Sequence, residues 1–216
     1  MTAVPVDRSV RGRPYAAMTL ERPEDRLAAG KASDAPRATP ARLLEAAAAE
    51  FNEHGFGGTD SNRIARRAGF APQTFYRWFE DKIDIFIQVY DAWQVEEAKV
   101  LAPLLATRAP DAEVAAAAVA HHRAYLKFRR SLRQLSLEHP KVRAARAASR
   151  LRQLERIRMG QGTAPRDPAV LAATLLQMER LADALAEDEI ADMALDPSAT
   201  MAALAALIGE LRRRPT

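Results

Sequence analysis

The sequence predicts an all-α fold, with a small three-helix head followed by a larger helical region. Apolar residues make up 48% of the 216 residues, yet many of them are alanine and only 6% of the chain is aromatic. Few residues are β-branched, so the composition favours helix over sheet. Apolar residues recur at helical spacing along most of the chain, and we find neither an internal repeat nor a convincing strand.

Residues 1–38 are expected to form a flexible basic arm. They are rich in Pro, Ala, Arg and Asp and show no helical periodicity. The arm contains Arg11-Gly12-Arg13-Pro14. An arginine pair around glycine can enter the narrow, electronegative minor groove of A·T-rich DNA. An unstructured tail without a DNA contact is the alternative, and the sequence leaves both interpretations open.

The first helix is predicted to begin at Thr39-Pro40, because threonine suits an N-cap and proline suits the first helical position. Its inward face is formed by apolar residues at helical spacing. These are Leu43, Leu44, Ala47, Ala48 and Phe51. Gly55 is expected to end the helix, since glycine readily adopts the left-handed conformation of a helix C-terminus.

Two short helices are predicted next. Thr59 is expected to cap the second helix, and Gly69 to end it after an inward face of Ile64, Ala65 and Ala68. A third helix is expected to start at Pro72. Phe75 and Phe79 lie four residues apart, so they would face the core together. The segment over residues 39–85 therefore reads as a helix-turn-helix domain.

The exposed residues of the third helix have side chains that suit nucleic-acid recognition. Gln73 can read adenine through two hydrogen bonds, and Thr74 can bond a base edge or contact a thymine methyl group. Tyr76, Trp78 and Lys82 can donate hydrogen bonds to phosphates. These properties predict a recognition helix that enters a DNA major groove. An ordinary helical hairpin with polar surface residues is the alternative.

Asp81 is expected to cap a fourth helix that leads out of the head, runs to about Leu101 and is broken or kinked at Pro103. Residues 86–216 are predicted to form a helical effector-binding and dimerisation domain. Further helices are expected at about 111–137, 140–158, 167–190 and 197–213. The helix at 111–137 is expected to be interrupted near Arg129–Ser131.

The net charge of +4 conceals an uneven distribution. Residues 121–158 contain twelve basic and two acidic residues, whereas residues 159–216 contain five basic and nine acidic residues. Four arginines and no acid lie between residues 61 and 79. This clustering suggests contact with a polyanion or, for residues 121–158, with an anionic small molecule. Solvated helix faces are the alternative.

Several classes of protein are disfavoured. The chain has no cysteine, which excludes disulfides and cysteine-based zinc sites. No apolar run approaches the roughly 20 residues needed to span a membrane, and the N-terminus lacks the apolar region of a secretory signal, so we expect a cytoplasmic protein. Motifs of metal, serine-nucleophile and phosphate-binding sites are absent. We therefore expect no enzyme, no catalytic residue, no metal site and no cofactor.

About residues 40–90 resemble the DNA-binding domain of the tetracycline-repressor (TetR/AcrR-like) family of bacterial regulators. The matching positions are Thr59, then Ile64-Ala65-x-x-Ala68-Gly69, then Thr74-Phe75-Tyr76-x-x-Phe79-x-x-Lys82. The resemblance implies phosphate contacts from Thr59, Tyr76, Trp78 and Lys82, and positions at or near bases for Pro72, Gln73, Thr74 and Arg77. Arg63, which replaces a frequent acid, is added to the predicted DNA-binding residues. Ala71 and Gln73 also depart from the family, which often has a capping Ser or Thr and a glycine there.

The same resemblance implies a ligand-responsive repressor. It would bind a near-palindromic double-stranded DNA operator as a homodimer, through the helices at about 167–190 and 197–213, and a small apolar or amphipathic effector would release it. The candidates for the effector pocket are Trp93, His121, His122, Tyr125, Phe128, Met159 and Met178. An enzyme or a protein-binding helical adaptor with the same head is the alternative. Turnover would favour the enzyme, and the absence of any small-molecule response would favour the adaptor.

Overall fold

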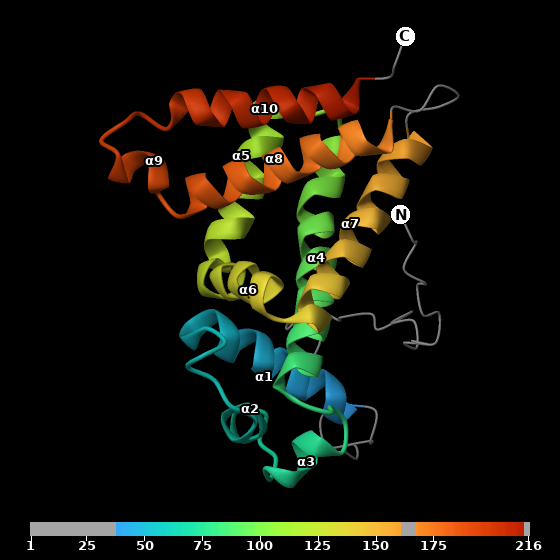
Figure 1. Cartoon of the computed structure of the whole chain (residues 1–216), viewed down its shortest axis with the longest axis vertical. Helices are drawn as coiled ribbons and strands as arrows, with labels where there is room; N and C mark the ends of the chain where they lie inside the picture. The colour runs from blue at the N-terminus through green and yellow to red at the C-terminus, as the bar shows by residue number, and fades with distance from the viewer. Residues whose placement is uncertain (1–37, 161–166, 214–216) are drawn as a thin grey trace, which may run out of the picture. The chain divides into compact units, whose positions relative to one another are not determined.

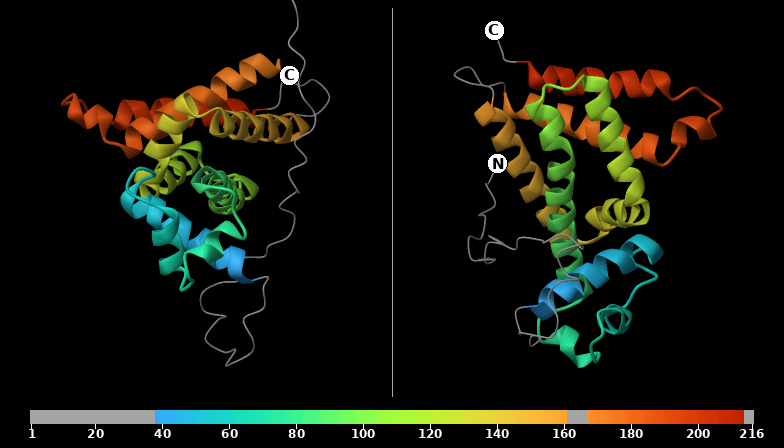
Figure 2. Two further views of the ribbon diagram at one scale, coloured as in Figure 1. Left: turned by 60° about the horizontal axis from the view of Figure 1, so that its bottom comes forward. Right: turned by 180° about the vertical axis from the view of Figure 1, so that it is seen from behind.

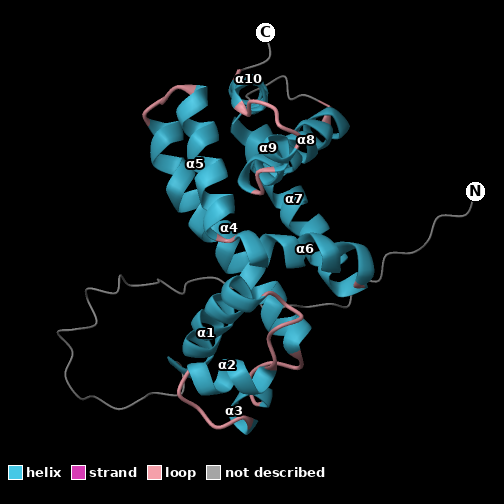
Figure 3. Cartoon of the chain, turned by 90° about the vertical axis from the view of Figure 1, so that its left-hand side faces the viewer, coloured by secondary structure: helices cyan, strands magenta, loops and turns pink. Residues whose placement is uncertain are grey.

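The computed structural model describes residues 38–160 and 167–213. The expected arm over residues 1–38, including Arg11-Gly12-Arg13-Pro14, lies outside the described residues except for the backbone of Ala38. The described residues belong to one compact unit. The described part of the chain is helical and contains no strand (Figures 1 and 3), so the all-α prediction is confirmed.

The helices follow one another along the chain with short connections. They are α1 (Ala38–His54), α2 (Ser61–Arg67), α3 (Gln73–Tyr76), α4 (Lys82–Ala106), α5 (Asp111–Ala124), α6 (Leu126–Glu138), α7 (Pro140–Gly160), α8 (Pro168–Ala186), α9 (Glu189–Asp192) and α10 (Ser198–Arg212).

Helices α1, α2 and α3 form the head around one apolar core. The predicted inward residues Phe51, Ile64 and Phe75 are fully buried, and Phe79 is almost so. Gly55 and Gly69 have positive φ angles of 70° and 77°, and each follows a helix end, as predicted. The aromatic rings of the head continue into α4 through Phe86, whose ring centroid lies 5.0 Å from that of Phe51.

The cap of α2 differs from the prediction. Asp60 is the N-cap, and its side chain accepts a hydrogen bond of 2.8 Å from the Arg63 backbone N–H. Thr59 is buried instead, and its hydroxyl donates to the carbonyls of Glu50 and Gly55. Both residues suit an N-cap. The tertiary turn between α1 and α2 uses the Thr59 hydroxyl, which leaves the adjacent Asp60 to cap the helix.

Helix α4 runs from the head into the upper helices (Figure 1). Asp81 caps it as predicted, with its carboxylate accepting from the Asp84 N–H. The expected end near Leu101 is wrong, because α4 continues through Pro103 to Ala106. Pro103 lies in the last turn, where its missing N–H leaves the carbonyl of the exposed Lys99 without a helical donor. The N–H of Thr107 donates to the Pro103 carbonyl at 3.0 Å and closes the end of the helix.

The predicted helix at 111–137 is interrupted at Tyr125, not near Arg129–Ser131. The interruption redirects the chain so that α6 packs on α1 (Figure 2). Lys127 Nζ donates to the Glu53 carbonyl at 2.7 Å, and Asn52 Nδ2 donates to the Ala124 carbonyl at 2.8 Å. No glycine or proline marks this site, so the packing between α6 and the head accounts for its position.

Helices α5, α8 and α10 pack together above the head. Leucine and isoleucine residues of the two helices expected to form the homodimer largely face the interior of this chain. Leu171, Leu175, Leu185, Leu204 and Ile208 are all buried within the described part of the monomer. Any contact with a second copy through these helices must therefore use other residues.

Candidate nucleic-acid interface and ligand cavity

The recognition surface is one short helix supported from behind. Helix α3 has four residues, Gln73–Tyr76, and Phe75 is its buried residue. Phe79 follows the helix, and its ring centroid lies 5.5 Å from that of Phe75. The two rings hold α3 against α1 and α2, while Gln73 and Arg77 are exposed. The side chains of Gln73 and Arg77, which can form hydrogen bonds with base edges, are thus accessible to solvent.

Aromatic and half-buried residues complete this surface. Tyr76 is 62% exposed, and its hydroxyl lies 2.7 Å from Ser61 Oγ. That contact fixes the phenol over the start of α2. Trp78 is 41% exposed, and Pro72 and Thr74 are half-buried. The exposed side chains of this segment are therefore those of Gln73, Tyr76, Arg77 and Trp78.

Two predicted phosphate ligands are already engaged within the head. The Thr59 hydroxyl is used in the turn between α1 and α2. Lys82 Nζ donates to the carbonyls of Phe56 at 2.8 Å and Thr59 at 2.7 Å, and it lies 3.9 Å from the centroid of the Phe56 ring. Burial lowers the pKa of the Lys82 ammonium. Lys82 thus ties the start of α4 to this turn.

The arginine cluster of the head is partly neutralised. Glu50, which is buried, accepts hydrogen bonds from Arg63 at 3.0 Å and Arg67 at 3.1 Å. Burial alone would raise the pKa of Glu50, but the bonds from these arginines lower it below its usual value. Arg66 and Arg77 are exposed and form no ion pair within the described residues. The pairing of Glu50 with these arginines could not be predicted from the sequence, because Glu50 lies on α1, more than ten residues before them.

A second candidate site is a cavity of about 590 Å³ between the helices above the head. Its walls come from α4, α5, α6, α7, α8 and α10. The volume lies within the range of roughly 300–1,000 Å³ that is typical of small-molecule pockets. Most lining residues are apolar, and a few polar side chains gather near Trp93. The cavity is therefore suited to an amphipathic small molecule.

The predicted pocket residues separate into two groups. Trp93, His122 and Met178 line the cavity. His121, Tyr125, Phe128 and Met159 do not: His121 is buried between the rings of Trp93 and Tyr125, Phe128 lies in the core against Phe86, and Met159 is 80% exposed. Residue type alone could not separate these groups, because an aromatic residue or methionine at helical spacing suits a core as well as a pocket.

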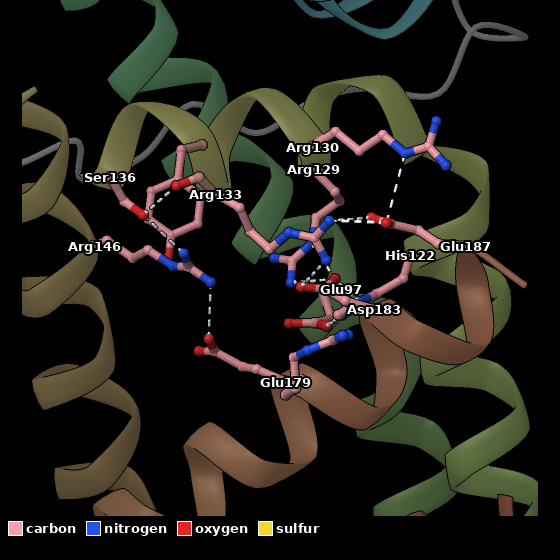
Figure 4. A network of polar contacts seen from close by, with 12 residues as sticks. Glu97, His122, Arg129, Arg130, Arg133, Ser136, Arg146, Glu179, Asp183 and Glu187 are labelled. Atoms are coloured by element: carbon pink, nitrogen blue, oxygen red, sulfur yellow. Dashed lines mark hydrogen bonds and ion pairs between the residues drawn. The ribbon is translucent and has the colours of Figure 1, made fainter. Parts of the chain in front are cut away.

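A buried polar network forms one side of the cavity (Figure 4). Asp183 on α8 accepts from His122 Nδ1 at 2.9 Å and from Arg129 Nε and Nη2 at 3.1 and 2.8 Å. The other ring nitrogen of His122 lies 3.2 Å from a carboxylate oxygen of Glu97. Burial alone would raise the pKa of Asp183, but the His122 bond and the charge of Arg129 hold it well below its usual range.

The same network explains the uneven charge of the sequence. Basic residues of α6 and α7 pair with acids of α8: Arg133 with Glu187, and Arg146 and Arg150 with Glu179. Burial alone would raise the pKa of Glu179, whereas the two arginines lower it. These arginines are therefore largely neutralised inside the chain. The expectation that residues 121–158 attract a polyanion or an anionic effector loses this part of its support.

The three-helix head and the helical region with its cavity define the class of helix-turn-helix regulators. Residues 43–89 match the family described as bacterial regulatory proteins, tetR family. A segment of 56 residues is 41% identical to an HTH-type transcriptional repressor of Streptomyces coelicolor, covering 26% of this chain and 29% of that repressor. The match to this family thus covers the head and the first part of α4, and the chain spans less than a third of the length of the repressor it matches.

Solved structures show that the likeness in fold extends beyond the head. A transcriptional regulator from Rhodococcus is similar with a TM-score of 0.56 at 21% identity, over 82% of this chain and 100% of that one. The regulator FadR from Bacillus subtilis, solved in complex with stearoyl-CoA, gives a TM-score of 0.52 at 18% identity, over 82% and 100%. At these identities the likeness supports the fold alone. Among the described residues, no helix is both long and apolar enough to cross a membrane.

Proposed function

We propose that this protein represses transcription by binding an operator in double-stranded DNA with α3 of each subunit of a homodimer. The exposed face of α3, supported by the buried Phe75 and Phe79, is the observation that carries the proposal. Base contacts require rigidly supported side chains, and Gln73 at the start of this helix and Arg77 just after it are exposed on the supported segment. The name of the Streptomyces coelicolor relative supports repression rather than activation.

The first test is selection of DNA from a random pool, followed by gel shifts at stated salt concentrations. In the selected operator, Gln73→Ala is expected to change base preference, because the glutamine amide contacts a base edge. Lys82→Ala is expected to weaken binding to every sequence and to lower the slope of log affinity against log salt by about one. If neither variant alters binding, α3 is not the recognition helix.

Lys82→Ala needs a stability control because Lys82 also bonds the turn between α1 and α2. Thermal unfolding separates the two roles. A lower melting temperature with an unchanged salt slope would assign Lys82 to the turn. A lower slope in a protein that is still folded at the assay temperature would assign it to phosphate contact.

The homodimer is proposed to form through outward stripes of α8 and α10. Val170, Ala173 and Leu176 share the exposed side of α8, and Leu176 is 46% exposed. Exposed alanines lie on α10 at positions 202, 203 and 206. Small and apolar residues on two adjacent helices allow close approach of a symmetry-related pair, as in a four-helix bundle.

Leu176→Glu is expected to convert the dimer into a monomer, since it places two charges at the proposed interface. Sedimentation velocity would measure the mass, and operator affinity would fall roughly a hundredfold because each head then binds alone. Leu137→Glu is the matched control, because Leu137 is 75% exposed on α6. A dimer that persists in the Leu176 variant would contradict the proposed interface.

The effector is proposed to bind in the cavity and to change the spacing of the two heads. Helix α4 connects both regions: it begins beside the head turn and lines the cavity from Trp93 to Leu105. Helix α6 adds a second connection, because Arg129 lines the cavity and Ser131 Oγ accepts from the Phe56 N–H at 2.9 Å. A ligand that favours one arrangement of these helices would shift the dimer between two geometries. The stearoyl-CoA held by the Bacillus subtilis regulator supports an amphipathic ligand in this fold.

A further inference from the structure

The three arginines of α2 have different surroundings. Arg63 Nε donates to Glu50 at 3.0 Å, and Arg67 Nη1 donates to Glu50 at 3.1 Å and to Glu53 at 2.7 Å. Arg66 is exposed, and its guanidinium forms no hydrogen bond or ion pair within the described residues. Two glutamates of α1 therefore neutralise two of the three arginines and leave Arg66 with its full charge.

The bonds to Glu50 restrain Arg63 and Arg67. Glu50 is 5% exposed, and its carboxylate accepts hydrogen bonds from both arginines. If a DNA phosphate drew Arg63 away, the buried carboxylate would keep its charge and lose a donor, which is costly. Arg66 gives up only contacts with water when it binds a phosphate. The balance of free energy thus favours Arg66 over its two neighbours as a DNA contact.

Arg66 lies on the outer face of α2. It follows Asn62 by four residues, so these two exposed side chains share one side of the helix, whereas Ile64 and Ala65 are buried. Helices α2 and α3 pack together at the end of the head farthest from α10 (Figures 1 and 3). When the second helix of a helix-turn-helix enters a major groove, the first helix crosses the sugar-phosphate backbone. Arg66 is thus an unpaired cation on the helix that meets phosphates.

We propose that Arg66 is the phosphate-binding arginine of α2, and that Arg63 and Arg67 hold α2 on α1 without contacting DNA. This inference rests on the proposed function, because it concerns the same DNA-binding head. It replaces Arg63, which the sequence analysis placed among the DNA-binding residues, by Arg66, which the sequence analysis did not name.

Gel shifts over a series of salt concentrations test the inference, with the full-length protein and the operator selected from the random pool. Arg66→Ala is expected to weaken operator binding roughly tenfold at low salt and to lower the slope of log affinity against log salt by about one for each bound subunit. A phosphate contact carries no sequence information, so binding to an unrelated duplex should weaken by a similar factor. Arg66→Lys keeps the charge and should keep the slope.

Arg63→Ala and Arg67→Ala are the matched comparisons. Each should lower the melting temperature, because Glu50 loses a donor, and each should leave the salt slope unchanged at a temperature where circular dichroism shows a folded protein. The melting temperature of Arg66→Ala should equal that of wild type, since Arg66 makes no bond within the described head. Arg108→Ala controls for the loss of one positive charge, because Arg108 is exposed just beyond the end of α4 that is remote from the head.

The outcomes separate the inference from the proposed function. An unchanged salt slope in Arg66→Ala, or an equal loss of slope in Arg63→Ala, would overturn the inference while leaving α3 as the recognition helix. A changed base preference in Arg66→Ala, with unrelated DNA bound as by wild type, would overturn the assignment to a phosphate. If the folded wild-type protein selects no operator, the proposed function fails, and the inference with it.

Discussion

Replacing Asp183 by Asn is expected to lower the free energy of unfolding by about 3–5 kcal/mol, the usual cost of breaking a buried ion pair. The Asp183 carboxylate is 2% exposed and accepts from both His122 and Arg129, and it also lies 3.5 Å from Arg133. Asparagine keeps the shape but removes the negative charge that faces these groups. Urea unfolding followed by circular dichroism at neutral pH, at fixed protein concentration, measures the change.

The difference between this variant and wild type should depend on pH. The pKa of Asp183 is lower in the folded protein than in the unfolded chain. Its stabilising effect is therefore fully present above the unfolded value of about 4 and is lost as the pH falls toward the folded value. The two unfolding curves should converge in acid. Asp192→Asn, at an exposed acid without an ion pair in the described residues, is the control; an equal effect of both substitutions would contradict the network.

Replacing Phe75 by Ala is expected to have the largest effect on DNA binding. Phe75 is the buried residue of a four-residue helix, and a helix of one turn has no stability without its packing. Truncating a buried phenylalanine costs about 3–5 kcal/mol. We therefore expect the head to lose its ordered recognition surface and the protein to lose sequence-specific binding in gel shifts. Hydrogen exchange should increase in α2 and α3.

Two controls locate the effect of Phe75→Ala in the head. The cavity should still bind the neutral fluorescent probe N-phenyl-1-naphthylamine with wild-type affinity, because none of its lining residues belongs to α1, α2 or α3. Phe75→Leu keeps an apolar side chain of intermediate size and should retain part of the operator affinity. Wild-type operator affinity in Phe75→Ala would show that α3 needs no aromatic support.

The head was largely predictable because its signals are local. Gly55 and Gly69 end helices through positive φ angles, and Asp81 caps α4 with its own side chain. The spacing of Phe75 and Phe79 places both rings on one face. The N-cap of α2 was assigned one residue too early, to Thr59 instead of Asp60, because a buried tertiary turn decides which of two suitable residues caps the helix.

The region after the head was predictable only in outline. Pro103 did not end α4, which continues for one turn beyond the expected end, and the carbonyl that loses its donor belongs to the exposed Lys99. The chain breaks at Tyr125 without glycine or proline, because the packing of α6 against α1 sets its direction. The residues that line the cavity could not be predicted from the sequence either. Glu97 and Gln153 are polar residues on otherwise mixed helices, and nothing in their spacing distinguishes a cavity wall from a solvated face.

The sequence by itself determined the all-α class, the helix-turn-helix head and the side chains that α3 exposes, because helical periodicity, capping and turn residues act over a few neighbouring positions. Only the tertiary structure decided which acidic residues pair with the basic residues. The arginines of residues 121–158, which look free in the sequence, meet Glu179, Asp183 and Glu187 across the interface with α8. The physical reason is that ion pairing and cavity formation depend on contacts between distant segments, and no local pattern in the chain records which helices will meet.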